Sequence, residues 1–409
     1  MLDCVVIGAG MAGLSATKRL RDAGLSVQCL EARGRIGGRA QSATLANGAL
    51  IDRGCHWLHS AEMNPLVGVA KALGFAVDKK AMGWTSAWSK KVLGKKRFKD
   101  YENFWDSVEE ACEGLDQEGS DLPLSEVVDR DSPWYAPWSA AITYIWGASP
   151  TEISAFSHAH ENDSELDWRM ALGMGNLVGR YGAGLPITLE APVRRIALTK
   201  KRVRVESARG VLEARTVVIA VPASLLAAEA IVFEPGLPET KRWALEGLPL
   251  GSDNKVHLAI SGDTPWPRKE IQATFHHDRE RTGHYFFHPF GQPVVEGYFG
   301  GALSNELAKA GPAAMADFAV EEICSHYGNA ARGCLSFLGA TAWDLDPWSL
   351  GAYSYVRPGY AKANAVLAEP LDGRLFFAGE ASHPEHSSTC HGAYMTGLRA
   401  ADEVLGAVR

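Results

Sequence analysis

The chain has 409 residues, of which 46% are hydrophobic and 22% are charged. This length and balance suit a globular protein with a sizeable core and two domains. A net charge of −7 and a pI near 6.0 exclude the basic footprint of nucleic-acid-binding proteins. No apolar run approaches the ~20 residues that a membrane span needs, so neither a nucleic acid nor a membrane is an expected partner.

Cysteine usage and the start of the chain favour a cytoplasmic protein. The seven cysteines are scattered without a C-x-x-C pair, which predicts reduced thiols and no disulfide framework or zinc site. The first strand is expected to begin at residue 3 or 4, which leaves no room for a signal peptide. The histidines of "HHDRERTGHYFFHPF" lie among aromatic residues in an expected hairpin, so they predict a structural role and no metal. The sequence predicts no particular oligomeric state.

The first residues predict a strand that ends in a glycine-rich turn. Residues 4–7 are an apolar run of strand length, and Gly8, Gly10 and Gly13 follow as G-x-G-x-x-G. The first glycine permits a tight turn, the second lets the backbone approach a pyrophosphate, and the third lets a helix pack on the strand. The motif alone is a weak signal, because purely structural turns also match it.

The next residues complete a strand–helix–strand unit. A helix is expected from about Ala12 to Ala23, with Gly24 as its stop, and a buried strand from Val27 to Leu30. Glu31 ends that strand, where a carboxylate can accept hydrogen bonds from ribose hydroxyls. The unit therefore fits a dinucleotide with its pyrophosphate at the helix N-terminus, either NAD or FAD.

A second glycine element separates these two cofactors. Gly37 and Gly38 lie between Arg35 and Arg39, where the backbone can approach a ligand and guanidinium groups suit phosphate oxygens. A nicotinamide site does not need such an element directly after the second strand, whereas an FAD buried lengthwise can use one. A solvated basic turn is the alternative interpretation.

The middle of the chain changes in composition. Residues 79–168 are rich in tryptophan, which predicts core side chains with some at a pocket. The basic stretch from Lys90 to Lys99 is expected to form a solvated hairpin around Gly94. The segment "NFWDSVEEACEGL" predicts a helix with one apolar face, formed by Phe104, Val108, Ala111 and Leu115.

Alternating patterns then indicate strands. Short strands are expected after residue 191 with a turn at Gly210, followed by a buried strand from Val217 to Val221 that Pro222 closes. Alternation returns at Lys255 in "KVHLAI". Nucleotide-binding segments at the start, middle and end of the chain are thus interleaved with substrate-binding segments.

The motifs "RIGGR", "DRGCHWLH", "APVRRI", "DNKVHL", "DPWSLGAYSY", "FAGE" and "STCHGA" follow the opening in this order. Together they resemble the flavin-containing amine oxidases over nearly the full chain, in particular polyamine and spermine oxidases and the lysine-specific histone demethylases. The resemblance implies an α/β fold with a Rossmann-type, GR2-like FAD-binding domain in residues 1–78, 175–247 and 340–409. An interleaved α+β substrate-binding domain with a mixed sheet would occupy residues 79–174 and 248–339.

The resemblance also implies FAD as cofactor. Glu31 would hold the adenosine ribose, the backbone at Val193 would meet the adenine, and Glu380 would lie near the ribityl–pyrophosphate portion. Arg39 and its neighbouring glycines would approach the flavin, and residues 54–57 would run along its isoalloxazine ring. The full set of implied FAD contacts is Gly8, Gly10, Met11, Ala12, Gly13, Glu31, Ala32, Arg33, Gly37, Gly38, Arg39, Gly54, Cys55, His56, Trp57, Val193, Trp348, Gly379, Glu380, Thr389, Cys390 and Ala393.

The attachment of FAD is expected to be non-covalent. Ala352 stands directly before Tyr353, at the position where mitochondrial monoamine oxidases carry the cysteine that attaches their flavin. The segment "STCHGAYMTGL" would add a second helix N-terminus near the flavin, where it would stabilise negative charge on the reduced ring.

Lys255 is the central catalytic candidate. From the strand pattern alone it is a solvated lysine that shares a face with His257 and Ala259. The resemblance instead matches it to the family lysine that contacts flavin N5 through a water.

Four further residues are implied to surround the reacting amine. Trp343 would lie beside the flavin, and Tyr353 would lie on its substrate face. Thr389 replaces the second aromatic wall that monoamine oxidases have, which favours an extended aliphatic amine over an arylalkylamine. His59 matches a pocket-edge histidine of spermine oxidases, with a capping or surface histidine as the alternative.

The implied reaction is hydride transfer from the α-carbon of a neutral amine to flavin N5. The imine is then hydrolysed to an aldehyde, and O2 reoxidises the flavin to give H2O2. A flavoenzyme acting on carbon–carbon bonds, such as a desaturase or porphyrinogen oxidase, a flavin isomerase and a non-catalytic FAD-binding interaction protein are the alternatives. No tower-like insertion is visible, so a nucleosome-directed role is not expected.

Overall fold

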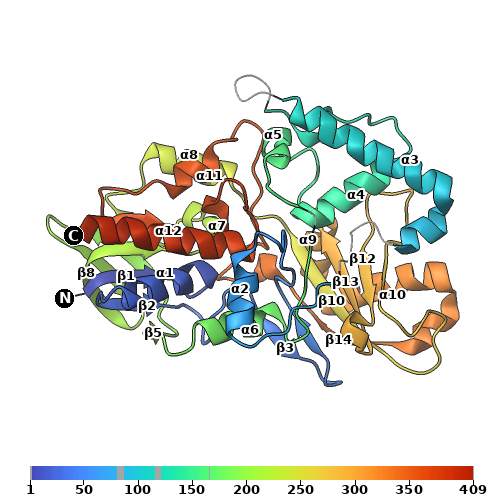
Figure 1. Cartoon of the computed structure of the whole chain (residues 1–409), viewed down its shortest axis with the longest axis horizontal. Helices are drawn as coiled ribbons and strands as arrows, with labels where there is room; N and C mark the ends of the chain where they lie inside the picture. The colour runs from blue at the N-terminus through green and yellow to red at the C-terminus, as the bar shows by residue number, and fades with distance from the viewer. Residues whose placement is uncertain (1, 81–86, 116–120, 165, 409) are drawn as a thin grey trace.

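The computed structural model describes residues 2–80, 87–115, 121–164 and 166–408. Two large β-sheets organise them, one in each half of the molecule (Figure 1). The eight-stranded sheet lies with helices α1 (Met11–Asp22) and α12 (Cys390–Val408), near both chain termini. The five-stranded sheet lies beside α9 (Gly301–Ala310) and α10 (Pro312–Tyr327) in the other half.

The eight-stranded sheet has the strand order β5-β2-β1-β8-β7-β6-β9, with β15 as an additional partner of β8. It mixes parallel and antiparallel pairs, and its central strands are buried on both faces, as parallel strands covered by helices are. Its strands are β1 (Leu2–Ile7), β2 (Val27–Leu30), β5 (Ile187–Thr188), β6 (Val193–Leu198), β7 (Val203–Ser207), β8 (Gly210–Ile219), β9 (Val232–Glu234) and β15 (Leu375–Phe377).

Strand β8 joins three distant parts of the chain. One edge of it pairs in parallel with β1 along residues 214–219. The other edge pairs with β7 over residues 210–214 and with β15 over residues 217–219. The start, middle and end of the sequence therefore meet in one sheet.

A glycine lets the last helix touch the first. A Cβ atom on Gly397 of α12 would lie 2.1 Å from the carbonyl oxygen of Ala12 in α1. Ser15 of α1 donates a hydrogen bond to the carbonyl oxygen of Tyr394 at 2.9 Å. Figure 1 shows the two helices running side by side along the sheet.

The five-stranded sheet has the order β11-β12-β13-β10-β14. All its pairs are antiparallel. The family resemblance implies a mixed sheet in the substrate-binding segments, but the mixed sheet is the larger, eight-stranded one. The short connections between β11, β12 and β13 favour this arrangement, because parallel pairing needs long crossovers. Its strands are β10 (Asp253–Ile260), β11 (Ile271–Ala273), β12 (His284–Phe287), β13 (Val294–Gly300) and β14 (Leu335–Ala340).

Smaller elements complete the fold and fill the space around the two sheets. A two-stranded sheet is formed by β3 (Ser42–Thr44) and β4 (Leu50–Asp52). The remaining helices are α2 (Pro65–Ala72), α3 (Ala87–Glu113), α4 (Tyr135–Trp146), α5 (Ala155–Ala159), α6 (Met174–Tyr181), α7 (Ala223–Ala227), α8 (Glu239–Gly247) and α11 (Ala363–Ala368).

The basic segment around Gly94 is helical, so the expected hairpin is wrong. This segment belongs to α3, and Gly94 marks a kink in the helix with φ 74° and ψ 159°. Lysine, leucine and arginine are good helix formers, so the glycine bends the helix and does not reverse the chain. Two details also differ from the expectation. Cys112, and not Ala111, is buried on the apolar face of α3, and β8 ends at Ile219 instead of Val221.

The tryptophan-rich region forms its own core between α3 and α4. Trp138 and Trp146 are buried there, as expected for core residues. Tyr101 of α3 packs on Trp134 with ring centroids 5.5 Å apart. Trp84 lies outside the described residues. Along the described chain, no helix combines the length and apolar character that crossing a bilayer requires.

Candidate functional site

The first glycine motif forms a tight turn between β1 and α1. Gly8 has a φ of +98°, and a Cβ there would lie 2.5 Å from the carbonyl oxygen of Ala220. A Cβ on Gly13 would lie 1.8 Å from the carbonyl oxygen of Gly8. A Cβ on Gly10, in contrast, would meet no heavy atom within 4 Å. The turn thus leaves open space at the glycine expected to approach a pyrophosphate.

The second glycine element packs on the first. A Cβ on Gly38 would lie 3.3 Å from the Cα of Gly10, and Gly37 donates a backbone hydrogen bond to the carbonyl oxygen of Ala9 at 2.8 Å. Both glycines have positive φ angles, +97° and +58°. The fold therefore brings these two glycine elements into one backbone surface at the N-terminus of α1, which begins with Met11 and Ala12.

Glu31 is buried at the end of β2 and supports this loop. Its two carboxylate oxygens accept hydrogen bonds from the backbone N–H groups of Ala9 at 2.7 Å and Arg33 at 2.8 Å. Each oxygen keeps a second lone pair. The carboxylate can therefore still accept a hydrogen bond from a ribose hydroxyl.

An open cavity of 690 Å³ is lined in part by the residues that directly follow Glu31 in the chain. Its walls are Ala32, Arg33, Gly34, Arg35, Glu190, Pro192, Ala208 and Trp348. Val193 lies next to the wall residue Pro192 and pairs with Ser207 between β6 and β7. The structure thus gathers Ala32, Arg33 and Trp348 around one cavity, and their contact with FAD stays a prediction.

Arg33 has protein partners inside this wall. Its guanidinium lies 2.6 Å from Asp346 and donates to the hydroxyl of Ser349 at 2.8 Å. The glycine-flanking arginines are therefore not all free for phosphate oxygens. Arg35 likewise donates to the carbonyl oxygens of Ile36 and Gly38.

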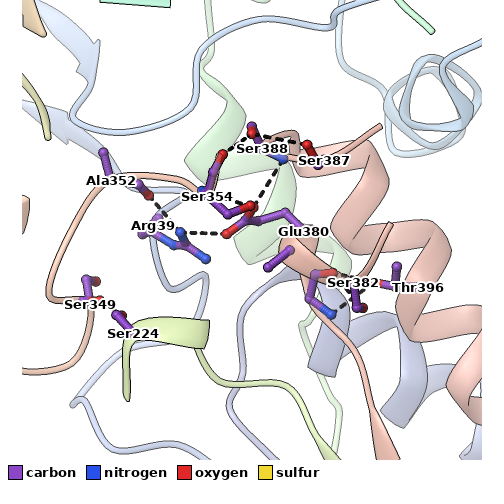
Figure 2. A network of polar contacts seen from close by, with 12 residues as sticks. Arg39, Ser224, Ser349, Ala352, Ser354, Glu380, Ser382, Ser387, Ser388 and Thr396 are labelled. Atoms are coloured by element: carbon purple, nitrogen blue, oxygen red, sulfur yellow. Dashed lines mark hydrogen bonds and ion pairs between the residues drawn. The ribbon is translucent and has the colours of Figure 1, made fainter. Parts of the chain in front are cut away.

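Glu380 is the centre of a buried polar network (Figure 2). One of its oxygens pairs with Arg39 at 2.9 Å, and Arg39 also donates to the carbonyl oxygen of Ala352. The other oxygen accepts from the Ser354 hydroxyl at 2.5 Å and from the Ser388 backbone at 3.1 Å. This network ties together the second glycine element, the segment before α12 and the segment of Tyr353.

The segment of residues 54–57 lies directly under the second glycine element. A Cβ on Gly54 would lie 1.7 Å from the carbonyl oxygen of Arg39 and 3.4 Å from the Trp343 ring. The Trp343 indole donates to the carbonyl oxygen of Arg53 at 3.1 Å. Burial lowers the pKa of His56 to about 3, so this imidazole is neutral at physiological pH. Trp57 is buried beside it, with the two ring centroids 5.2 Å apart.

Cys55 and Cys390 lie together although they are 335 positions apart in the chain. The hydrogen bond between their side chains, with burial, raises the pKa of the Cys55 thiol well above its usual range. A protonated thiol is a poor nucleophile.

The N-terminus of α12 is capped by Thr389. Its hydroxyl accepts from the backbone N–H of Gly392 at 2.9 Å and donates to the carbonyl oxygen of His386. This is a typical N-cap interaction. Cys390 and Ala393 follow in the first turn, and Gly379 donates to the hydroxyl of Thr396 in the next turn. The capping hydroxyl thus already has one backbone partner in the helix and one in the segment before it.

Lys255 is buried, with 3% of its surface exposed, so the interpretation as a solvated strand lysine is wrong. Its ammonium group donates to the carbonyl oxygen of Asp52 at 3.0 Å and pairs with Glu296 at 3.3 Å. It also lies 4.6 Å from the ring centroid of Tyr298. The lysine is therefore held between β4, which precedes the segment of residues 54–57, and the five-stranded sheet.

Glu296 is a functional candidate that sequence reasoning missed. Its second oxygen lies 3.0 Å from Nε2 of His257, and its first also bonds the Tyr298 hydroxyl. Burial opposes ionisation, but the Lys255 ammonium and the His257 hydrogen bond hold the pKa of Glu296 well below its usual range. A glutamate inside the apolar run "VVEGYFG" was the available signal.

Asp253 and Tyr353 form a second buried contact. Burial and the neighbouring carboxyl of Asp253 raise the pKa of the Tyr353 phenol well above its usual range. The Tyr353 hydroxyl donates to the carbonyl oxygen of Tyr144 at 3.2 Å. Asp253 directly precedes the "NKVHL" motif and was also missed.

His59 pairs with the buried Asp167 at 2.8 Å and is half-buried. Burial opposes protonation, but the charge and hydrogen bond of Asp167 raise the pKa of His59. The histidine therefore is an ion-paired group and not a helix cap. Its place at the edge of a substrate pocket stays a prediction.

Other histidines have structural partners. His284 bonds the Thr274 hydroxyl at 2.9 Å and stacks on Tyr144. In the described part of the chain, no group of three or more histidine, cysteine, aspartate or glutamate side chains is arranged to hold a metal.

Comparison with known proteins decides the family. The family model "Flavin containing amine oxidoreductase" matches residues 11–142 and 117–405. The chain belongs to this family. Its members include proteins similar to the chain over almost its whole length, and the α/β fold expected from the sequence is confirmed.

Two relatives from Arabidopsis thaliana illustrate the range of the family. Probable polyamine oxidase 4 is 27% identical and aligns over 97% of this chain and 85% of its own. Lysine-specific histone demethylase 1 homolog 2 is also 27% identical, with 98% of this chain and 58% of its own aligned. The chain thus aligns with most of a polyamine oxidase but with little more than half of a demethylase.

Solved structures show the same fold. Cyclohexylamine oxidase from Brevibacterium oxydans IH-35A has a TM-score of 0.78 and 22% identity, with 100% of this chain and 99% of that chain covered. Putrescine oxidase bound to putrescine has a TM-score of 0.77 and 20% identity, with 99% of each chain covered.

Proposed function

We propose that this member of the family is an FAD-dependent amine oxidase. The observation that carries the proposal is the buried ammonium of Lys255, held by Asp52 and Glu296 beside the segment of residues 54–57. Burying a lysine costs free energy unless it is paired, so a chain keeps one where the charge acts. Desaturase-like and isomerase-like enzymes do not call for this arrangement together with Tyr353.

FAD fits the residues that are present. Gly10 leaves open backbone, Glu31 keeps acceptor lone pairs, and the cavity at Trp348 suits an adenosine. Bound FAD would supply the redox chemistry, accepting a hydride from the α-carbon of an amine and returning the electrons to O2 as hydrogen peroxide.

The chain's own residues would bind and orient the amine. Tyr353 offers an aromatic wall, and the buried surroundings of Tyr353 favour the neutral form of a bound amine. The Lys255 ammonium holds a fixed positive charge at the site, where it can stabilise negative charge and orient the water that hydrolyses the imine. No strong side-chain base is needed in this scheme.

FAD attachment is proposed to be non-covalent. Ala352 has no thiol, and the protonated Cys55 is a poor nucleophile towards a flavin. Precipitating the yellow protein with acid should release the colour into the supernatant. Colour that stays with the pellet would contradict this part of the proposal.

The substrate is proposed to be an extended aliphatic amine. Thr389 cannot form a second aromatic wall opposite Tyr353, so the site offers an arylalkylamine only one stacking surface. A comparison of kcat/KM for spermidine and phenethylamine tests this preference. A tenfold advantage for phenethylamine, about 1.4 kcal/mol of transition-state preference, would overturn it.

The central experiment is an anaerobic screen of the holoenzyme. Mono-, di- and polyamines are added in turn, and bleaching of the flavin absorbance is followed. Air is then admitted, and hydrogen peroxide is measured. Bleaching by at least one amine with peroxide on reoxidation is expected. A flavin that no amine bleaches would refute amine oxidation and leave the carbon–carbon oxidoreductase or the non-catalytic FAD-binding protein.

A further inference from the structure

In the described part of the chain, Asp253 and Glu322 are buried carboxylates that each keep one oxygen without a hydrogen bond, but His276 lies 3.9 Å from that oxygen of Glu322. Asp253 is 7% exposed, and its Oδ2 atom has no hydrogen-bond partner among the described residues. Four other buried acids use both carboxylate oxygens, and these are Glu31, Asp52, Glu296 and Glu380. A buried acceptor without a donor costs free energy, so it requires an explanation beyond folding.

The position of Asp253 links it to the proposed reaction. Alternate residues of a strand share a face, so Asp253 lies on the same face of β10 as Lys255. Its carboxyl interacts with Tyr353, whose hydroxyl reaches the backbone of Tyr144. Both tyrosines are half-buried, so each keeps some accessible surface.

Helix α4 is brought to this point by close backbone packing. A Cβ on Gly300, the register partner of Asp253, would lie 2.1 Å from the carbonyl oxygen of Thr143. The contact fixes Tyr144 against the end of β10. His284 stacks on Tyr144, with ring centroids 5.2 Å apart, which holds the tyrosine in place.

No described cation is left to neutralise Asp253. The nearby Lys255 is already paired with Glu296. Burial is the main cause that raises the pKa of Asp253 to about 8, and the negative charges of Asp344 and Glu296 act in the same direction. A cationic group that entered the site would favour ionisation of this carboxyl and gain a charge-assisted hydrogen bond.

We propose that Asp253 binds the second, non-reacting ammonium group of a diamine or polyamine substrate. The site therefore selects such substrates over monoamines of the same length. The rings of Tyr144 and Tyr353 add cation–π attraction to this second ammonium group. This assignment rests on the proposed amine oxidase function and specifies its substrate class.

The test compares putrescine with butylamine, which lacks only the second ammonium group. In the holoenzyme, Asp253→Asn should lower kcat/KM for putrescine by about ten- to a hundredfold and leave butylamine within about threefold. Anaerobic flavin reduction by each amine is followed in parallel. Asp263→Asn, at an exposed position after the same strand, is the matched control and should change neither substrate.

A structural role for Asp253 would lower both substrates equally, and this result would overturn the proposal. So would a parent enzyme that does not prefer putrescine to butylamine. Asp253→Glu gives an independent test, because one added methylene should shift the preferred diamine towards a shorter chain. An unshifted preference also contradicts the proposal. A parent flavin that no amine reduces would refute the amine oxidase function itself, and this assignment with it.

Discussion

The two ends of the proposed site are built by different means. At the nucleotide end, Gly8, Gly13 and Gly38 form a surface of bare backbone, where a single Cβ would collide. At the amine end, Lys255 and Glu296 are buried side chains that lie on different strands. The first end depends on backbone shape and the second on paired charges. Substitutions at the first end should therefore abolish cofactor binding, whereas those at the second should lower stability or turnover.

The largest effect is expected at the nucleotide end. Gly13→Ala places a Cβ 1.8 Å from the carbonyl oxygen of Gly8, which the backbone cannot avoid without moving α1 off β1. The purified variant should contain no flavin, because the pyrophosphate surface is lost. Flavin absorbance per protein and the Tm measure this.

Gly179→Ala is the matched control. Gly179 lies in α6, and a Cβ there would meet no heavy atom within 4 Å. The change should keep full flavin content and add about 0.4–1 kcal/mol to the free energy of unfolding. Normal flavin content in the Gly13→Ala variant would break the comparison between the two ends.

At the amine end, Glu296→Gln should destabilise the fold without removing the cofactor site. It leaves the Lys255 ammonium buried and unpaired, and breaking a buried pair costs about 3–5 kcal/mol. Urea unfolding measures the loss. Glu306→Gln removes one partner of an exposed ion pair with Arg281 and should have no measurable effect. Equal losses of unfolding free energy in both variants would show that the buried pair stabilises the fold no more than the exposed one.

Lys255→Met sharpens the distinction between binding and turnover. Methionine keeps the apolar stem but removes the charge and the donors, so FAD should still bind. Losing a charge-assisted hydrogen bond of about 1.5–3 kcal/mol should slow one half-reaction about ten- to a hundredfold. Stopped-flow spectra separate reduction by the amine from reoxidation by O2.

Lys309→Met, at an exposed position of α9, is the control for this variant and should leave both rates unchanged. If the Lys255→Met rates both stay within about twofold of the parent, less than ~0.5 kcal/mol, Lys255 has no catalytic role. The amine end would then be a structural ion pair only.

The smallest effect is expected in the pH dependence of stability. Burial raises the pKa of Asp253 from 3.8 to about 8. Between these values the native state holds a proton that the unfolded chain has lost, so this carboxyl makes the free energy of unfolding fall as pH rises. Lys255, Tyr353, Asp344 and Glu296 face it and stay the same in the variant.

Asp253→Asn removes this contribution. The stability of the parent minus that of the variant should therefore decrease steadily between about pH 5 and pH 8. Urea unfolding at several pH values measures the difference. A difference that stays constant over this range would contradict the raised pKa.

The nucleotide end could be predicted from the sequence because its information is local. Gly8 to Gly13 and Gly37 to Gly38 are short motifs whose conformation follows from the missing side chain, and Glu31 follows at the expected distance. The structure adds their contact with each other, which no spacing indicates, and the pairing of Arg33 with Asp346.

The amine end could be predicted only in part, because its partners are distant in sequence. The strand pattern alone made Lys255 a solvated residue, and only the family resemblance moved it to the site. Glu296 lies on a neighbouring strand 41 positions later, and Tyr353 reaches Asp253 from a segment beyond the sheet. Such pairings depend on strand register, which single-sequence patterns do not determine.

The junction at β8 has a consequence for how the protein is made. Strand β1 emerges first from the ribosome, but its partner β8 follows about two hundred residues later, and β15 and α12 come last. Contacts of such long sequence separation slow folding and leave apolar edges exposed meanwhile. The glycine surface itself lies within the first forty residues, but the strands beside it and the helix that packs on α1 are made much later, so we expect FAD to bind the finished chain.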